Sequence, residues 1–164
     1  MKRTPKRRLT ALLVLVLAIS TAAVAQHVGD PEAGEEIFTR NCQACHQANG
    51  TGVSGAFPPL VGTVPAFLHA GGDGRATLVS IVLFGLQGQI TAAGERFDGV
   101  MPSWRGTLAD AAIADVLAYL STAWGNGAAL PAEFTPFSSD EVATLRERDW
   151  TPQRVHEAWL ELGF

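Results

Sequence analysis

Apolar residues recur at helical spacing in three stretches of the chain, which predicts a protein built mainly from α-helices. The first stretch begins at Asp30-Pro31, an N-cap residue followed by a proline suited to the first helical position. The second runs from Arg75 to Phe84 and is apolar on most sides, as expected of a buried helix. The third runs from Thr107 to Ala123 and is the natural crossing partner for Gly34, whose missing side chain permits close helix contact.

Residues 131–164 predict two further short helices. Ser138 followed by Glu141 forms a capping box at the start of one, and Thr151-Pro152 opens the other, which ends at Gly163. Two short helices cannot bury their apolar faces alone. Packing back on the rest of the protein is favoured, and docking on a partner is the alternative.

The N-terminus carries the three parts of a secretory signal peptide. Five basic residues are followed by an apolar run from Leu9 to Ile19 and by Ala23-Val24-Ala25, an A-x-A cleavage site. A membrane-spanning helix needs about 20 apolar residues, so a cleaved signal over residues 1–25 is favoured over an uncleaved anchor. Either way the rest of the chain is expected outside the cytoplasmic membrane, in the periplasm or another extracytoplasmic space, soluble or membrane-anchored.

Charge narrows the range of partners. Removing residues 1–25 takes away five of the 12 basic residues and none of the 16 acidic ones, which leaves a net charge of −9 on residues 26–164. A chain this acidic is not expected to bind nucleic acid or anionic lipid through its charge. Protein partners with a basic or neutral docking face and the plain solubility of an exported protein explain the charge equally well.

The segment Cys42-Gln43-Ala44-Cys45-His46 predicts covalent attachment of one haem c. Each thiol can add across a haem vinyl group to form a thioether, and His46 is then held as the proximal iron ligand. A zinc site would need further ligands at similar spacing, and the chain has no other cysteine. A thioredoxin-like pair would lie in a βαβ context, which is not seen, and a structural disulfide is not expected once haem takes both thiols.

The segment Phe57-Pro58-Pro59-Leu60 supplies two further candidate haem-binding residues, Pro58 and Leu60. A backbone carbonyl in this segment can accept the free ring N–H of His46, which fixes the tautomer of the imidazole and strengthens it as a ligand. Leu60 is expected to lie against the haem face. An ordinary proline turn is the alternative interpretation.

Met101 is the candidate second axial ligand, because a thioether opposite histidine suits low-spin iron and the only other methionine is Met1. His69 is the alternative if Met101 is not the ligand. Trp104 can line the haem edge and donate its indole N–H to a haem propionate, although core packing explains it equally well. Arg75 is more readily explained as a solvated arginine than as a propionate partner.

Taken together, residues from about Asp30 to Trp124 resemble a class I (monohaem) cytochrome c domain. The matching elements are Gly34, Phe38, Cys42-Gln43-Ala44-Cys45-His46, Phe57-Pro58-Pro59-Leu60, Gly99-Val100-Met101-Pro102 and Leu117-Ala118-Tyr119-Leu120. The segment from Leu86 to Ile90 looks like the variant in cytochrome subunits of bacterial oxidases and dehydrogenases. The resemblance implies an all-α class I cytochrome c fold wrapping one covalent haem, with His46 and Met101 as axial ligands and the first and last core helices crossing near Gly34.

The predicted organisation is a signal peptide or uncleaved N-terminal anchor over 1–25, a cytochrome c domain over 26–130 and a C-terminal helical extension over 131–164. The predicted function is to carry single electrons between a donor and an acceptor protein, without catalysis. One alternative is a dedicated haem subunit of a terminal oxidase or periplasmic dehydrogenase, with the extension as docking element. The other is a catalytic or gas-sensing cytochrome whose Met101 detaches. Membrane association through the N-terminus or a partner complex stays open.

Overall fold

Helix α1 (Pro31–Asn41) crosses helix α5 (Asp110–Thr122) at a point where no side chain would fit. In the computed structural model, which describes residues 26–164, a Cβ on Gly34 would overlap the Asp115 carbonyl oxygen and lie 2.8 Å from Tyr119 Cβ. Phe38 packs one turn further on, with its ring centroid 5.4 Å from that of Tyr119. The crossing predicted from Gly34 is therefore confirmed. It packs the first helix of the cytochrome-like region, α1, against the last helix of that region, α5.

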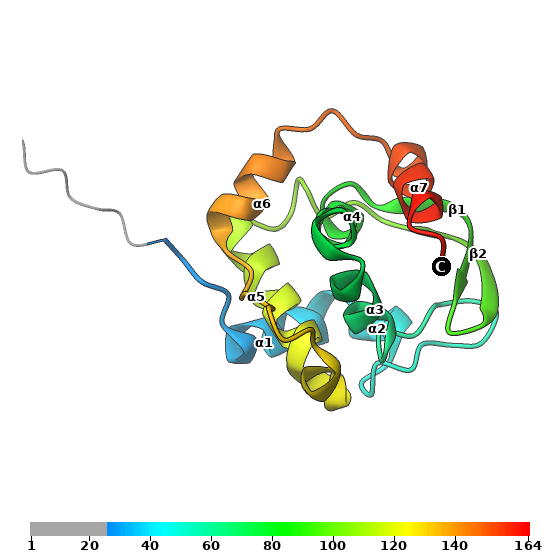
Figure 1. The fold of residues 1–164 in the computed structure, drawn as a ribbon, viewed down its shortest axis with the longest axis horizontal. Coiled ribbons are helices and arrows are strands. Elements are labelled where there is room, and N and C mark those ends of the chain that lie inside the picture. Colours follow the sequence, from blue (N-terminus) through cyan, green and yellow to red (C-terminus); the bar gives the residue numbers. More distant parts are fainter. Residues whose placement is uncertain (1–25) are drawn as a thin grey trace, which may run out of the picture.

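The described residues form an all-α fold with one small β-hairpin (Figure 1). The elements in chain order are α1 (Pro31–Asn41), α2 (Gln43–His46), α3 (Thr63–His69), α4 (Gly71–Phe84), β1 (Leu86–Ala92), β2 (Glu95–Met101), α5 (Asp110–Thr122), the 3-10 helix η1 (Ala123–Ala129), α6 (Ser139–Arg146) and α7 (Pro152–Glu161). None of the helices in this part of the chain has the length and apolar character that crossing a membrane requires.

Of the helix starts expected from the sequence, the one at Asp30 is correct and the one at Thr107 is not. The Asp30 side chain accepts a hydrogen bond from the Glu32 backbone N–H at 2.9 Å, as an N-cap should. The expected start of the α5 helix at Thr107 is wrong, because the Thr107 N–H bonds the Trp104 carbonyl in a separate turn and α5 begins at Asp110. The predicted signal peptide over residues 1–25 lies outside the described residues.

The hairpin between α4 and α5 was not expected. Strands β1 and β2 pair antiparallel, with Leu86 opposite Met101 and Ile90 opposite Phe97. The turn residues Ala93 and Gly94 both have positive φ, 50° and 79°, as the tight hairpin turns that match strand twist require. The hairpin leaves the all-α class of the fold intact and forms part of the site described below.

The C-terminal helices pack back on the core, with α6 against α4 and α5, and α7 against α4 and β1 (Figure 1). The guanidinium of Arg75 on α4 fixes this arrangement. It donates to both carboxylate oxygens of Glu141 at 2.6 and 2.7 Å, and its carbon lies 3.9 Å from the centroid of the Phe137 ring. The expectation that Arg75 is simply solvated is therefore wrong, since its side chain is only 18% exposed.

Candidate functional site

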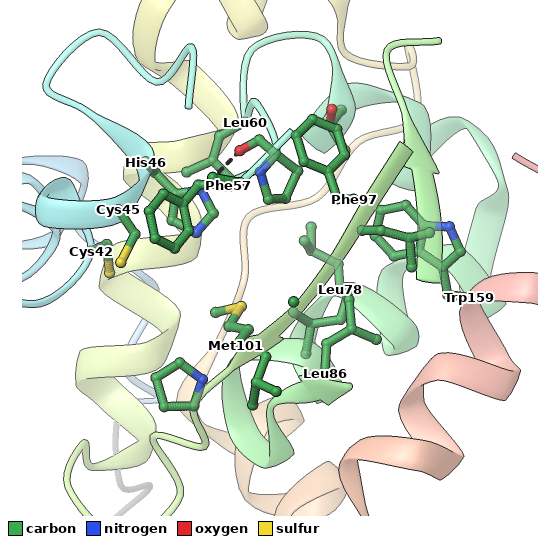
Figure 2. A pocket seen from close by; sticks show the side chains of 18 of the residues that line it. Cys42, Cys45, His46, Phe57, Leu60, Leu78, Leu86, Phe97, Met101 and Trp159 are labelled. Atoms are coloured by element: carbon green, nitrogen blue, oxygen red, sulfur yellow. Dashed lines mark hydrogen bonds between the residues drawn. The ribbon is translucent and has the colours of Figure 1, made fainter. Parts of the chain in front are cut away.

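One large cavity collects every residue that the sequence singles out as a haem contact. These residues are Cys42, Cys45, His46, Pro58, Leu60, Met101 and Trp104. The cavity encloses about 1030 Å³, a figure that includes the open solvent at its mouth. Figure 2 shows the two cysteines, His46 and Met101 around this single space.

The cysteines and His46 are presented by a single helical turn. Helix α1 ends at Asn41, and the backbone N–H of His46 bonds the Cys42 carbonyl at 3.0 Å to close the turn of α2. Residues three and four apart on a helix lie on the same side. Both thiols are free and half-buried, and they face the cavity beside the imidazole (Figure 2).

Burial sets the protonation states at this turn. It raises the pKa of the Cys42 thiol to about 11, with a smaller contribution from the neighbouring Cys45, so Cys42 is a neutral thiol at neutral pH. Burial also lowers the pKa of His46, and the hydrogen bond to the Pro58 carbonyl opposes only part of that shift. The imidazole is consequently neutral, which is the form that binds metals.

The loop after α2 fixes the orientation of the imidazole. His46 Nδ1 lies 3.0 Å from the Pro58 carbonyl oxygen, the kind of bond that the proline segment predicted. Because a carbonyl only accepts, Nδ1 must carry the proton and Nε2 must keep its lone pair. Gly52 allows the loop to approach this closely, since its φ is +66° and a Cβ there would overlap the Phe57 carbonyl oxygen.

Met101 reaches the cavity from the end of β2. The chain after it is fastened to α4 by two hydrogen bonds, from Ser103 Oγ to the Leu83 carbonyl at 2.6 Å and from the Trp104 N–H to the Val82 carbonyl at 3.1 Å. These bonds hold the Met101 thioether at the cavity although it lies 55 residues after His46 in the chain.

The sequence missed the other side of the cavity. We call Cys42, Cys45, His46, Pro58 and Leu60 the motif wall. We call Leu78, Leu86, Ile90, Phe97 and Trp159 the far wall. In Figure 2, Leu78, Leu86 and Trp159 lie on the side away from the cysteines.

The far wall comes from α4, the hairpin and α7. For its hairpin part, the one signal in the sequence was the alternation of polar and non-polar residues from Leu86 to Ala92, which matches the alternating burial of β1. No local signal in the sequence marks Trp159 as a residue of this cavity.

The remaining histidines take no part in the cavity lining. His69, the alternative to Met101, has its Nε2 3.0 Å from the Ala129 carbonyl, and His156 has its Nε2 2.7 Å from the Gln89 carbonyl. Within residues 26–164, no group of three His, Cys, Asp or Glu side chains is placed to hold a metal ion. The structure therefore adds no ligands for a zinc ion to the cysteine pair.

Known proteins share this sequence pattern. The family model for cytochrome c matches residues 31–124. Cytochrome c-552 of Thermus thermophilus is 44% identical over 130 residues, which cover 79% of this chain and 96% of that protein. Cytochrome c6 of Picosynechococcus sp. is 32% identical over 110 residues, 67% of this chain and 85% of that protein.

Similarity also extends to a subunit of a larger enzyme. The cytochrome c subunit of the quinone alcohol dehydrogenase of Gluconobacter oxydans is 35% identical over 109 residues, which cover 66% of this chain and 22% of that subunit. The family match spans more than half of the chain, and the Thermus protein is matched over nearly its full length. The chain therefore belongs to the cytochrome c family of electron-transfer proteins.

Proposed function

We propose that this protein is an exported monohaem c-type cytochrome that passes single electrons between redox partners outside the cytoplasmic membrane. The observation that carries the proposal is the convergence of two thiols, one neutral imidazole and one thioether on a single apolar cavity. Haem c, when bound, supplies an iron centre that exchanges one electron at a time.

The residues of the cavity fit such a group. Cys42 and Cys45 would hold it through thioether bonds, and His46 and Met101 would be its axial ligands. Leu60 and Trp104 would lie against it, and the Pro58 carbonyl holds His46 in the tautomer whose Nε2 can bind metal. The donor set is one nitrogen and one neutral sulfur, which favours a high reduction potential.

The chain's own residues determine what the site does. If His46 and Met101 both hold the iron, no coordination position would be left for a substrate, and the site would relay electrons. The far wall is lined by apolar side chains, which would keep water from the bound group and disfavour its more highly charged oxidised state. Partners must approach the open mouth, where Val100 is 66% exposed and Phe57 38% exposed. Redox encounters of this kind use small interfaces.

The test is the optical spectrum of the native protein and of Met101→Ala. The native ferric protein should show the weak far-red absorption band of iron–thioether ligation. The variant should lose that band, bind carbon monoxide rapidly when reduced and have a lower reduction potential. The matched control is Val28→Ala, an exposed apolar residue that does not line the cavity and should keep all three properties. A native-like spectrum in Met101→Ala would reject Met101 as ligand.

Export is tested separately. Fractionation of the producing cell, with N-terminal sequencing of the mature chain, should place the protein outside the cytoplasm. It should also show either cleavage after Ala25 or retention of residues 1–25 as an anchor. Recovery of the protein from the cytoplasm with its basic N-terminus intact would reject this part of the proposal.

A second candidate function is that of a dedicated haem subunit in a dehydrogenase complex, favoured by the similarity to the alcohol dehydrogenase subunit. The C-terminal helices pack on their own core, as the favoured prediction had it, and are therefore less suited to be a docking element. Analytical ultracentrifugation after mild membrane extraction distinguishes the two functions. A monomer supports the free carrier, and a larger stable assembly supports the subunit.

A further inference from the structure

Thr63 carries a buried polar atom that the rest of the protein leaves unsatisfied. Among the described residues, its Oγ1 is the one buried side-chain nitrogen or oxygen without a hydrogen-bond partner. The buried hydroxyls of Ser80 and Ser121, by contrast, each donate to a carbonyl four residues earlier, Ala76 at 2.8 Å and Leu117 at 2.7 Å. Thr63 is the first residue of α3, so no helical turn precedes it to supply such a carbonyl.

An unpaired buried hydroxyl destabilises the fold, because it has lost its hydrogen bonds to water without replacing them, and a bound group is the natural explanation for it. Thr63 lines the large cavity and also a second cavity beside it. Trp159 is the other residue common to both linings, whereas neither cysteine lines the second cavity. Thr63 therefore lies where the large cavity adjoins the second cavity, whose lining includes neither cysteine.

The chemistry of haem suggests what Thr63 meets. Its vinyl groups and its two propionates lie on opposite edges of the porphyrin, so a haem tethered at Cys42 and Cys45 directs its carboxylates away from them. The propionates are the acceptors on an otherwise apolar group. A hydroxyl is a suitable donor to a carboxylate.

No cationic side chain competes for that position in the described part of the chain. Neither cavity is lined by arginine or lysine. Arg75, the one basic residue that the sequence suggested as a propionate partner, is engaged with Glu141. We infer that the Thr63 hydroxyl donates a hydrogen bond to a haem propionate and positions the far edge of the haem. This inference rests on the proposed haem site.

The test compares Thr63→Val with Thr63→Ser in the purified haem-loaded protein. Valine keeps the shape of threonine and removes the hydroxyl, whereas serine keeps the hydroxyl and removes the methyl group. Resonance Raman spectroscopy reports the propionate bending mode, whose frequency falls when a hydrogen bond to the carboxylate is lost. We expect a lower frequency in Thr63→Val and the native frequency in Thr63→Ser.

The outcomes separate this inference from the proposed function. A native frequency in Thr63→Val would overturn the inference and mean that water satisfies the hydroxyl. A shift in Trp104→Phe, with none in Thr63→Val, would overturn it in favour of the Trp104 indole as donor. A protein that carries no covalent haem would instead reject the proposed function itself. If Thr63→Val does not accumulate, Thr63→Ala provides the same comparison.

Discussion

The two walls of the cavity differ in how the chain makes them. The motif wall comes from 19 consecutive positions, Cys42 to Leu60, and its side chains are placed by one helical turn and one loop. The far wall is assembled from α4, the hairpin and α7, with Leu78 and Trp159 81 residues apart. The chemistry of the site is therefore local in sequence, whereas its isolation from water depends on long-range packing.

The far wall should be the more sensitive of the two to the loss of one large side chain. Trp159 is 4% exposed, and its ring centroid lies 4.8 Å from that of Phe67. We expect Trp159→Ala to lower the free energy of unfolding by about 3–5 kcal/mol. Urea denaturation measures this effect. The reduction potential should also fall, because water would gain access to the far wall.

Leu160 is the matched control for Trp159. It is the next residue on α7 and is 57% exposed. Leu160→Ala should change the free energy of unfolding by no more than about 0.5 kcal/mol. Equal effects of the two substitutions would show that the far wall does not depend on α7.

The motif wall should also be sensitive to a substitution outside the cavity, at the crossing of α1 and α5, because α1 leads directly into the turn that carries the cysteines. Gly34→Ala forces a Cβ against the Asp115 carbonyl and should cost about 3 kcal/mol, measured by urea denaturation. Gly72→Ala is the control, because Gly72 is also helical but has open space around it. That control should be neutral or stabilising by up to about 1 kcal/mol. A neutral Gly34→Ala would contradict the close crossing.

The smallest expected effect concerns the attachment of the C-terminal segment. Arg75→Leu removes charged hydrogen bonds to Glu141 in a partly buried setting and should cost about 2 kcal/mol in thermal or urea unfolding. The visible spectrum should stay unchanged, because Arg75 does not line the cavity. Arg40→Leu, which removes an exposed pair with Glu36, should cost less than about 0.5 kcal/mol. Similar costs for both would make the Arg75 contact an ordinary surface pair.

The difference between a wall built from neighbouring positions and a wall built from distant ones also explains which parts of the fold the sequence could predict. Cap residues and cysteine spacing act over a few positions, so α1, the motif wall and the starts of α6 and α7 follow from local chemistry. The capping box at Ser138 is only half formed. Its hydroxyl accepts from the Glu141 N–H at 3.3 Å, but the Glu141 carboxylate turns to Arg75 instead. Such competition from tertiary partners cannot be read from spacing.

The hairpin illustrates a second limit. Its turn is Ala93-Gly94, with Ala93 at positive φ, where Asn-Gly or Asp-Gly would have given a recognisable signal. Gly88 in β1 also weakens the strand pattern, and its conformation becomes intelligible only in the structure, where the His156 ring of α7 packs over it. The contribution of α7 to the cavity could not be predicted either, because nothing in the sequence near Trp159 indicates its contact with a cavity whose other lining residues lie between positions 41 and 104.

The most direct test of the central claim is the intact mass of the purified native protein after acid–acetone extraction. If Cys42 and Cys45 tether the pigment, the colour stays with the polypeptide and its mass exceeds that of the chain by one haem. Release of the pigment into the acetone, or a colourless native protein in which both thiols can be alkylated, would contradict the account.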